Sequence, residues 1–211
     1  MPFKHPCFIS YAHGNYSLIK GFMDQLVNVL NDYLDPYFKE RLYLDKEELQ
    51  VGERFERKLA EAICRSVCMI VVYSPKYDTR NFCLREYRAM EILEQRRLHL
   101  LGDRAQGRGL IIPIVLRGNL PDKIKQNIHY YDFSSFTTAT RDIRKNSKYV
   151  KAIDEIAEYI YSLKEDLEGL EIDVCGDCES FTLPPADSVS PLRTGNLNPP
   201  FPGTSSETSE E

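Results

Sequence analysis

The stretch Val67-Cys68-Met69-Ile70-Val71-Val72-Tyr73, followed by Ser74-Pro75, decides the fold. It is short, continuously apolar and rich in β-branched side chains, which is typical of a parallel strand covered by helices on both faces. It is also far too short to span a bilayer. We therefore expect a buried central strand over residues 67–73, with a loop starting at Ser74.

Strand-like and helix-like patterns alternate on both sides of this central run. The other predicted strands cover residues 7–10, 41–44, 109–116 and 130–133, and apolar residues at three- and four-residue spacing predict helices at about 19–30, 53–64, 82–97 and 153–163. Such alternation indicates an α/β fold with right-handed crossovers and a parallel sheet. Five strands favour the flavodoxin-like order 2-1-3-4-5, in which a crevice opens beyond the carboxyl ends of the first and third strands.

Composition excludes several classes of protein. The chain has 27 Lys and Arg against 32 Asp and Glu, and the resulting net charge of −5 argues against a nucleic-acid binder. Lys4-His5-Pro6 leads directly into a strand pattern, without the charged and apolar regions of a signal peptide. We therefore expect a cytoplasmic protein without membrane contact.

The cysteine pattern predicts reduced thiols. The six cysteines of the chain are too few and too scattered for a disulfide scaffold, so a reducing compartment is the better interpretation. Cys175 and Cys178 form a Cys-x-x-Cys pair, but no second pair of metal ligands accompanies it. The pair also does not follow a strand at a helix start, as redox pairs do. We expect neither a metal nor a redox site there.

The composition changes near residue 184. Residues 184–211 carry six of the twelve prolines and repeated Ser and Thr. Such a segment buries too little apolar surface to offset the entropy lost on ordering. We expect a folded domain at 1–170 and a C-terminal extension at 171–211 that is largely disordered from 184.

Four motifs resemble the Toll/interleukin-1 receptor (TIR) domain family, and they occur in the family's order over about residues 5–165. Phe8-Ile9-Ser10-Tyr11-Ala12-His13 resembles the first strand and loop, and Tyr43-Leu44-Asp45 with Gly52-Glu53-Arg54-Phe55 resembles the second strand and the BB loop. The segment 71–77 is similar to the third strand and its Ser-Pro-x-Tyr exit. Asn81-Phe82-Cys83-Leu84-Arg85-Glu86 resembles the Ser-x-Trp-Cys-x-x-Glu motif.

The chain departs from the family pattern in three places. Phe82 stands where the family usually has Trp, and Asn81 replaces the usual Ser. The BB loop has Asp45 and Gly52 but lacks the Arg-Asp-x-x-Pro-Gly form of animal receptors. This last difference favours the bacterial-type, NAD-cleaving branch over the receptor adaptors.

The resemblance implies that Glu86 is a catalytic residue and that NAD⁺ is the substrate, with no separate cofactor and no metal. Nicotinamide leaves NAD⁺ as a neutral molecule, so no general acid is needed, and one carboxylate facing an oxocarbenium-like ribose suffices. Phe82 lies one helical turn before Glu86, so its ring and the carboxylate share a helix face. A flat ring beside a carboxylate suits a nicotinamide riboside.

Three further residues are candidates for substrate binding, and each has a structural alternative. Tyr11 follows the first strand, where its ring either stacks on the ligand or packs the sheet edge. Ser10 either binds ligand or caps the loop, and Asp45 either contacts the ribose or forms a turn.

The function that this resemblance implies is NAD⁺ glycohydrolase or cyclase activity in an immune, anti-phage effector. Because constant NAD⁺ cleavage poisons a cell, we expect gating by TIR–TIR self-association, or by a separate sensor or downstream effector protein. The alternative is a non-enzymatic adaptor that acts by self-association alone. A phosphoacceptor receiver domain is rejected, because the strand ends carry Ser10-Tyr11 and Tyr73-Ser74 where it needs acidic residues. The product (ADP-ribose, a cyclic isomer or a conjugate) stays open.

Overall fold

The computed structural model describes residues 3–14, 17–44, 55–136, 143–170 and 172–193. Its centre is a five-stranded sheet in the predicted order β2-β1-β3-β4-β5, in which every neighbouring pair is parallel. The strands are β1 (His5–Tyr11), β2 (Tyr43–Leu44), β3 (Ser66–Tyr73), β4 (Ile111–Val115) and β5 (Tyr131–Asp132). The predicted flavodoxin-like architecture is therefore confirmed.

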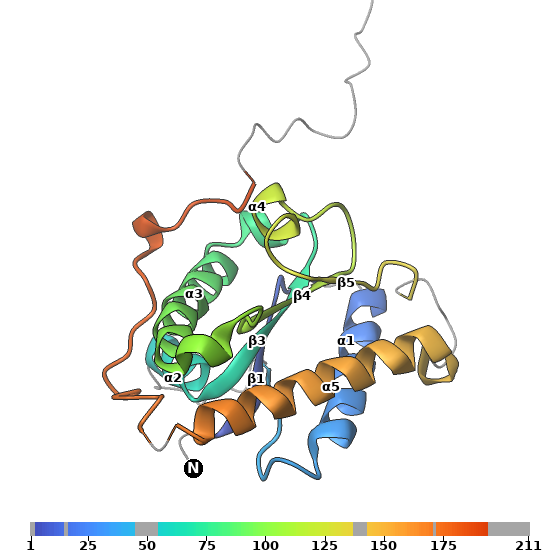
Figure 1. Cartoon of the computed structure of the whole chain (residues 1–211). Helices are drawn as coiled ribbons and strands as arrows, with labels where there is room; N and C mark the ends of the chain where they lie inside the picture. The colour runs from blue at the N-terminus through green and yellow to red at the C-terminus, as the bar shows by residue number, and fades with distance from the viewer. Residues whose placement is uncertain (1–2, 15–16, 45–54, 137–142, 171, 194–211) are drawn as a thin grey trace, which may run out of the picture.

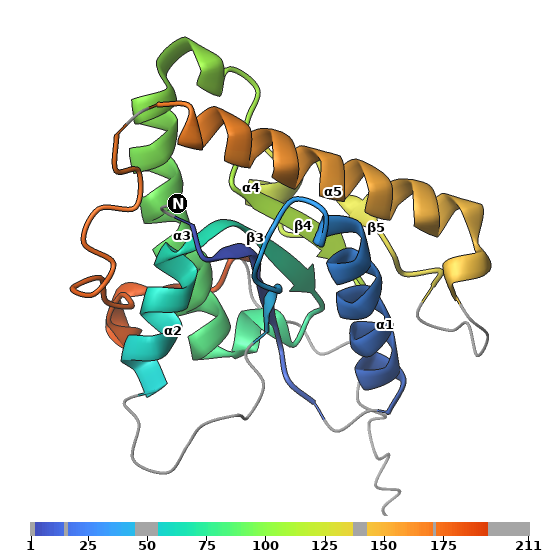
Figure 2. The same ribbon diagram turned by 90° about the horizontal axis from the view of Figure 1, so that it is seen from below.

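Helices cover both faces of the sheet (Figures 1 and 2). On one face lie α1 (Ser17–Leu34) and α5 (Ser147–Glu168), and on the other lie α2 (Phe55–Cys64) and α3 (Asn81–Leu101). A single helical turn, α4 (Asp122–Lys125), joins β4 to β5. Within the described residues, no helix has the length and apolar character needed to cross a membrane.

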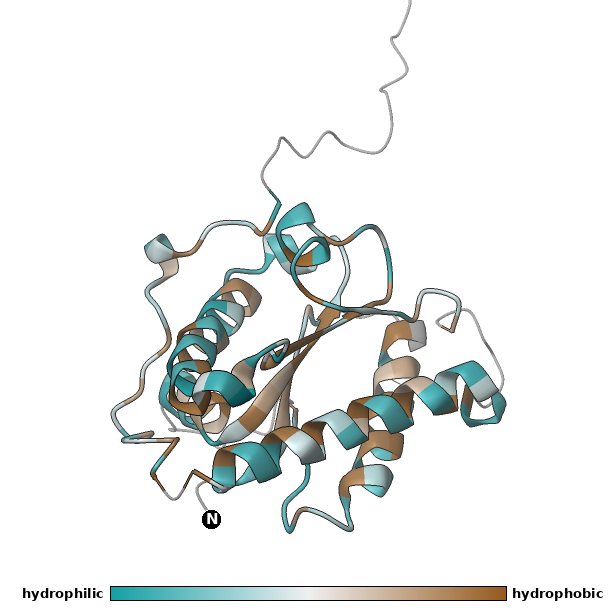
Figure 3. Ribbon diagram, in the orientation of Figure 1, coloured by the Kyte–Doolittle hydropathy of each residue, from teal (hydrophilic) through white to brown (hydrophobic). Residues whose placement is uncertain are grey.

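Strand β3 forms the core of the molecule. All eight of its residues are buried, and its backbone pairs with β1 on one side and β4 on the other, so that Ile70 lies between Ile9 and Ile112. Apolar residues dominate the strands at the centre of the sheet in Figure 3. Burying a Val, Ile or Met side chain contributes roughly 1.5–3 kcal/mol, so this strand alone accounts for a large part of the folding driving force.

The C-terminal strap, which we define as residues 172–193, packs along α3 as the orange-to-red segment of Figure 1. Arg85 Nε donates a hydrogen bond to the carbonyl of Pro184 (2.6 Å), and Asn81 Nδ2 donates one to the carbonyl of Ala186 (3.2 Å). Leu183 and Leu192 are buried. Residues 184–193, which the composition places in the predicted disordered tail, therefore contact the domain. Residues 194–211 lie outside the described residues.

A disulfide joins Cys64, at the end of α2, to Cys178 in the C-terminal strap. The expectation of six reduced cysteines is thus wrong for these two residues, while the other four carry thiols. The two half-cystines are 114 residues apart in the sequence. Their spacing in the chain therefore gave no sign that the fold would bring the strap against the end of α2.

The far end of the C-terminal strap is held by a buried carboxylate. Asp78 has a side chain that is only 1% exposed; it accepts hydrogen bonds from the Tyr73 hydroxyl (2.7 Å) and from the Leu192 backbone N–H (3.2 Å). Arg193 Nε lies 3.4 Å from the Asp78 carboxylate and 3.0 Å from the Tyr73 oxygen. A buried carboxylate needs such partners, because desolvation of an unpaired charge is costly.

We predict that Arg193→Ala destabilises the protein by about 1–3 kcal/mol, because it leaves the Asp78 carboxylate buried with neutral donors only. Urea unfolding followed by circular dichroism measures this. Lys151→Ala is the control, since Lys151 is an exposed partner of Glu155 on α5 and its loss should change stability by about 0.5 kcal/mol or less. Equal effects of the two substitutions would mean that the Arg193 contact does not hold the strap.

Candidate functional site

The candidate site lies where β1 and β3 end and α3 begins. Strand β1 ends at Tyr11, and β3 ends at Tyr73. The chain then turns sharply, with the Tyr77 N–H donating to the Ser74 carbonyl (2.8 Å), and enters α3 at Asn81. This short connection places the first turns of α3 beside the end of β1. The strand order reverses between β1 and β3, and in folds of this kind ligands bind at this topological switch point, beyond the carboxyl ends of the two strands.

Three buried side chains from β1, the connecting turn and α3 form the polar centre of the site. Ser10 Oγ donates a hydrogen bond to Glu86 Oε2 (2.5 Å) and lies 2.7 Å from the Tyr77 hydroxyl. The Tyr77 hydroxyl also lies 3.1 Å from the carbonyl of Cys83. Because the Ser10 proton points to Glu86, the single phenol proton of Tyr77 is directed either to Ser10 Oγ or to the Cys83 carbonyl.

Glu86 is not a surface charge. It is 4% exposed, Ser10 is 1% exposed and Tyr77 is fully buried. Burial raises the pKa of Tyr77 well above its usual range, so the phenol remains a neutral hydrogen-bonding group. A buried carboxylate costs folding free energy even when it accepts hydrogen bonds, and stability alone therefore does not favour a glutamate at this position.

Phe82 and Tyr11 are less enclosed than the polar centre. Phe82 is 44% exposed, and its ring meets the Phe55 ring edge-on at 5.6 Å between centroids. It occupies the first turn of α3, one turn before Glu86, as predicted from the spacing. Tyr11 is half-buried, and its ring lies 4.3 Å from that of His13. Both rings thus combine packing contacts with partial exposure.

The sequence did not single out Arg85 as a site residue. In the structure, Arg85 connects α3, α2 and the C-terminal strap next to the site. Its guanidinium forms two parallel hydrogen bonds of 2.8 Å with the Glu56 carboxylate on α2, lies 5.3 Å from the Phe82 ring centre, and contacts the C-terminal strap at Pro184. The hydrogen bonds between these two side chains, and then their opposite charges, raise the pKa of Arg85 and lower that of Glu56. No spacing rule identifies contacts between residues so far apart in the chain.

The other predicted site features have different outcomes. Asp45, with the rest of the loop 45–54, lies outside the described residues, so its role stays a prediction. Tyr77 was part of the quoted Ser-Pro-x-Tyr motif, but its contact with Ser10 was not expected. In the described part of the chain, no group of three or more His, Cys, Asp or Glu side chains is arranged to hold a metal ion.

Comparison with known families identifies the chain. The family model of the TIR domain matches residues 7–145, which is more than half of the chain. This segment contains most of β1, the other four strands and the polar centre described above. The chain therefore belongs to the TIR domain family.

Two further comparisons add little beyond the family. Among solved structures, the chain is similar to the TIR domains in the structure of the activated Roq1 resistosome directly recognizing the pathogen effector XopQ. The identity is 19%, the match covers 74% of this chain and 82% of that chain, and the TM-score is 0.34. A search of curated proteins found no significant match.

We predict that Ser10 and Glu86 are energetically coupled. In a double-mutant cycle of Ser10→Ala and Glu86→Gln, the coupling free energy should be about 1 kcal/mol, because a hydrogen bond to a carboxylate is roughly twice as strong as one to a neutral amide. Urea unfolding of the four proteins provides the measurement. The control cycle pairs Ser10→Ala with Glu91→Gln, since Glu91 contacts Arg88 and Lys123 instead. Additivity in both cycles would show that the Ser10–Glu86 contact contributes nothing specific.

Proposed function

We propose that the chain is an NAD⁺ glycohydrolase or cyclase of the bacterial-type branch of the TIR family, with Glu86 as the catalytic carboxylate. The observation that supports this proposal most is the burial of Glu86 at the switch point of the sheet, where Ser10 donates to its Oε2 at 2.5 Å. Buried ionisable groups held in a defined geometry are enriched at functional sites.

The proposed chemistry uses the Glu86 carboxylate for electrostatic stabilisation. Positive charge develops on the ribose as the bond to nicotinamide breaks, and a fixed carboxylate facing that charge lowers the barrier. The low polarity around a group that is 4% exposed makes this interaction stronger than it would be in water. Nicotinamide leaves as a neutral molecule, so the reaction needs neither a general acid nor a cofactor.

Ser10 and Tyr77 act as positioning residues in this proposal. Ser10 directs its proton to Glu86 Oε2, and the Tyr77 hydroxyl packs against the Ser10 oxygen from the other side at 2.7 Å. A carboxylate whose orientation is set in advance does not have to reorganise during the reaction. This role differs from both alternatives that the sequence left open for Ser10, which were direct contact with the ligand and capping of the loop.

The remaining candidates supply binding surface in this proposal. The partly exposed rings of Phe82 and Tyr11 offer flat faces for the nicotinamide or the adenine, and Asp45 contacts a ribose hydroxyl. TIR–TIR self-association, or a separate sensor or downstream effector, gates the activity in an anti-phage or other immune response. The rival proposal of a non-enzymatic adaptor predicts self-association without NAD⁺ cleavage.

We predict that Glu86→Gln lowers nicotinamide release about 10²–10³-fold without unfolding the protein, because the amide keeps the shape of the side chain but removes its charge. The measurement is single-turnover nicotinamide release at matched protein concentrations, up to concentrations that allow self-association, with circular dichroism melts alongside. Glu91→Gln is the matched control on the same helix and should retain wild-type turnover.

The outcomes separate the two proposals. Wild-type turnover in a folded Glu86→Gln protein would remove Glu86 from the reaction. Absence of turnover in the concentrated wild-type protein, together with self-association, would instead favour the adaptor.

A further inference from the structure

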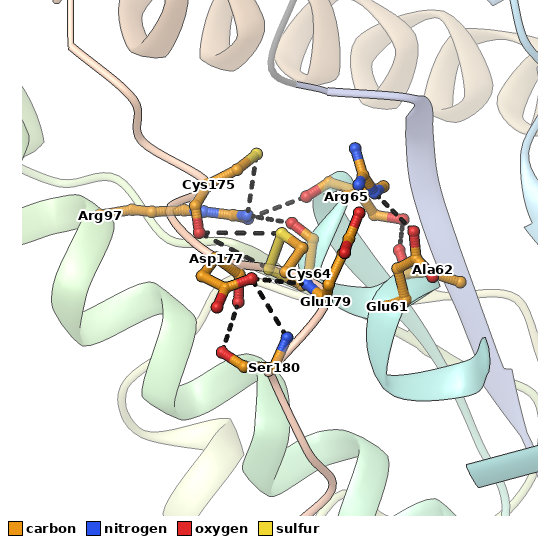
Figure 4. A network of polar contacts seen from close by, with 11 residues as sticks. Glu61, Ala62, Cys64, Arg65, Arg97, Cys175, Asp177, Glu179 and Ser180 are labelled. Atoms are coloured by element: carbon orange, nitrogen blue, oxygen red, sulfur yellow. Dashed lines mark hydrogen bonds and ion pairs between the residues drawn. A yellow bond between two sulfur atoms is a disulfide. The ribbon is translucent and has the colours of Figure 1, made fainter. Parts of the chain in front are cut away.

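Three cysteines and one arginine meet where the C-terminal strap crosses the end of α2 (Figure 4). The disulfide between Cys64 and Cys178 connects the two segments, and Cys175 lies three residues before Cys178. The Cys64 and Cys178 sulfurs lie 3.6 and 3.7 Å from the carbonyl oxygen of Cys175. The thiol of Cys175 lies 3.9 Å from Arg97 Nη2. A thiol and a disulfide are thus held within one small cluster.

Arg97 is the unusual member of this cluster. Its side chain is fully buried, and its Nη atoms donate to the carbonyls of Cys64 (2.5 Å) and Ser66 (2.8 Å). Its guanidinium carbon Cζ lies 4.9 Å from the centre of the Phe3 ring. Within the described residues, the hydrogen-bond acceptors of its Nη atoms are backbone carbonyls and the Cys175 sulfur rather than a carboxylate, and its Nε has no hydrogen-bond partner. Burial lowers the pKa of Arg97 to about 10.

A buried cation without a carboxylate creates a place for an anion. One anion that the fold offers at this position is the thiolate of Cys175, because its sulfur accepts a hydrogen bond from Arg97 and can itself carry a negative charge. Burial raises the pKa of the Cys175 thiol and Arg97 opposes that rise. The thiolate is therefore a minor form in the packed protein, but it has a stabilising partner when it forms.

We propose that Cys64, Cys175 and Cys178 form an internal thiol–disulfide exchange site. The Cys175 thiolate attacks the sulfur of Cys178, a bond forms between these two sulfurs, and the bond between Cys64 and Cys178 breaks. Cys64 leaves as a thiolate and takes up the proton that Cys175 released. One thiol and one disulfide are present before and after the step, so no external oxidant or reductant is needed.

The local backbone holds Cys175 and Cys178 in a tight turn. Gly176 has φ of +64°, a conformation that glycine adopts without strain, and the Cys178 N–H donates to the Gly176 carbonyl at 3.0 Å. Asp173 Oδ1 accepts from the Cys175 N–H at 3.1 Å. The Cys-x-x-Cys segment is therefore a tight, hydrogen-bonded turn whose two cysteines are already close in the chain.

Burial of the disulfide favours attack by the internal thiol of Cys175 over attack by a thiol dissolved in the solvent. Cys64 is 1% exposed and Cys178 is 4% exposed, so a dissolved thiol reaches the disulfide only when the segment opens. Cys175 lies inside the same cluster. Effective concentrations of neighbouring groups far exceed those of free reagents, so the internal attack has the kinetic advantage.

Exchange would change how the C-terminal strap is held. The bond from Cys178 to Cys64 crosslinks the strap to α2, whereas a bond from Cys178 to Cys175 stays within the strap. After exchange, only non-covalent contacts such as those of Arg85 and Arg193 keep the strap on the domain. The site would thus control the attachment of the segment that covers α3, whatever reaction the domain performs.

Disulfide mapping of the full chain tests this proposal. The protein is kept at neutral pH, treated with N-ethylmaleimide in denaturant, and digested with pepsin in acid, where exchange stops. We expect two species, one with the Cys64–Cys178 bond and labelled Cys175, the other with the Cys175–Cys178 bond and labelled Cys64. The second species should become several-fold more abundant in Arg193→Ala, which loosens the strap. Detection of only the Cys64–Cys178 bond in both proteins, or of no bond, would overturn the proposal.

Two cysteine variants control the mapping. Cys175→Ser should retain only the Cys64–Cys178 bond, whereas Cys68→Ser, which removes a different buried thiol, should leave both species in their wild-type ratio. Hydrogen–deuterium exchange then compares Cys64→Ser with Cys175→Ser. Amides of the strap should exchange at least about tenfold faster in Cys64→Ser. Equal rates would show that the bond to α2 does not hold the strap. The mapping of the wild-type protein stands even if a variant fails to fold.

Discussion

Burial of β3 on both faces is the constraint on which the rest of the structure depends. A strand whose eight residues are all buried needs a strand on each side and helices above and below it, and right-handed crossovers then leave few arrangements of the chain. The observed order β2-β1-β3-β4-β5 is one of them. The same arrangement brings the carboxyl ends of β1 and β3 together, which is why Ser10 and Glu86 meet at this position.

Four buried charged side chains lie on α3 or in the turn that precedes it. Glu86, Arg85, Arg97 and Asp78 are all buried, and each is held by groups from another segment of the chain. Arg85 and Asp78 contact the C-terminal strap directly, and Arg97 lies beside Cys175 within it. Because an unpaired buried charge is costly, these contacts tie the strap to the domain. The strap is thus part of the folded unit up to residue 193.

The fold could be predicted because it depends on patterns that are local in the sequence. The apolar run 67–73 and the spacing of apolar residues in the helices were enough to predict the strand order. The spacing of Phe82 and Glu86 placed both on α3, but only the structure revealed that Ser10 bonds to Glu86, since 76 residues separate them. The strap was missed because its contacts use backbone carbonyls at Pro184 and Ala186, which composition does not reveal. The disulfide was missed for a similar reason.

The central claim is that NAD⁺ binds against the buried carboxylate of Glu86. The most direct test is ¹³C NMR of the glutamate side-chain carboxyl groups during titration with carba-NAD⁺, an analogue that resists cleavage. The Glu86 signal, assigned from its absence in Glu86→Gln, should shift as the ligand saturates the protein, while the signal of Glu91 on the same helix should stay in place. Saturable binding that leaves the Glu86 signal unchanged, or no binding at all, would contradict the claim.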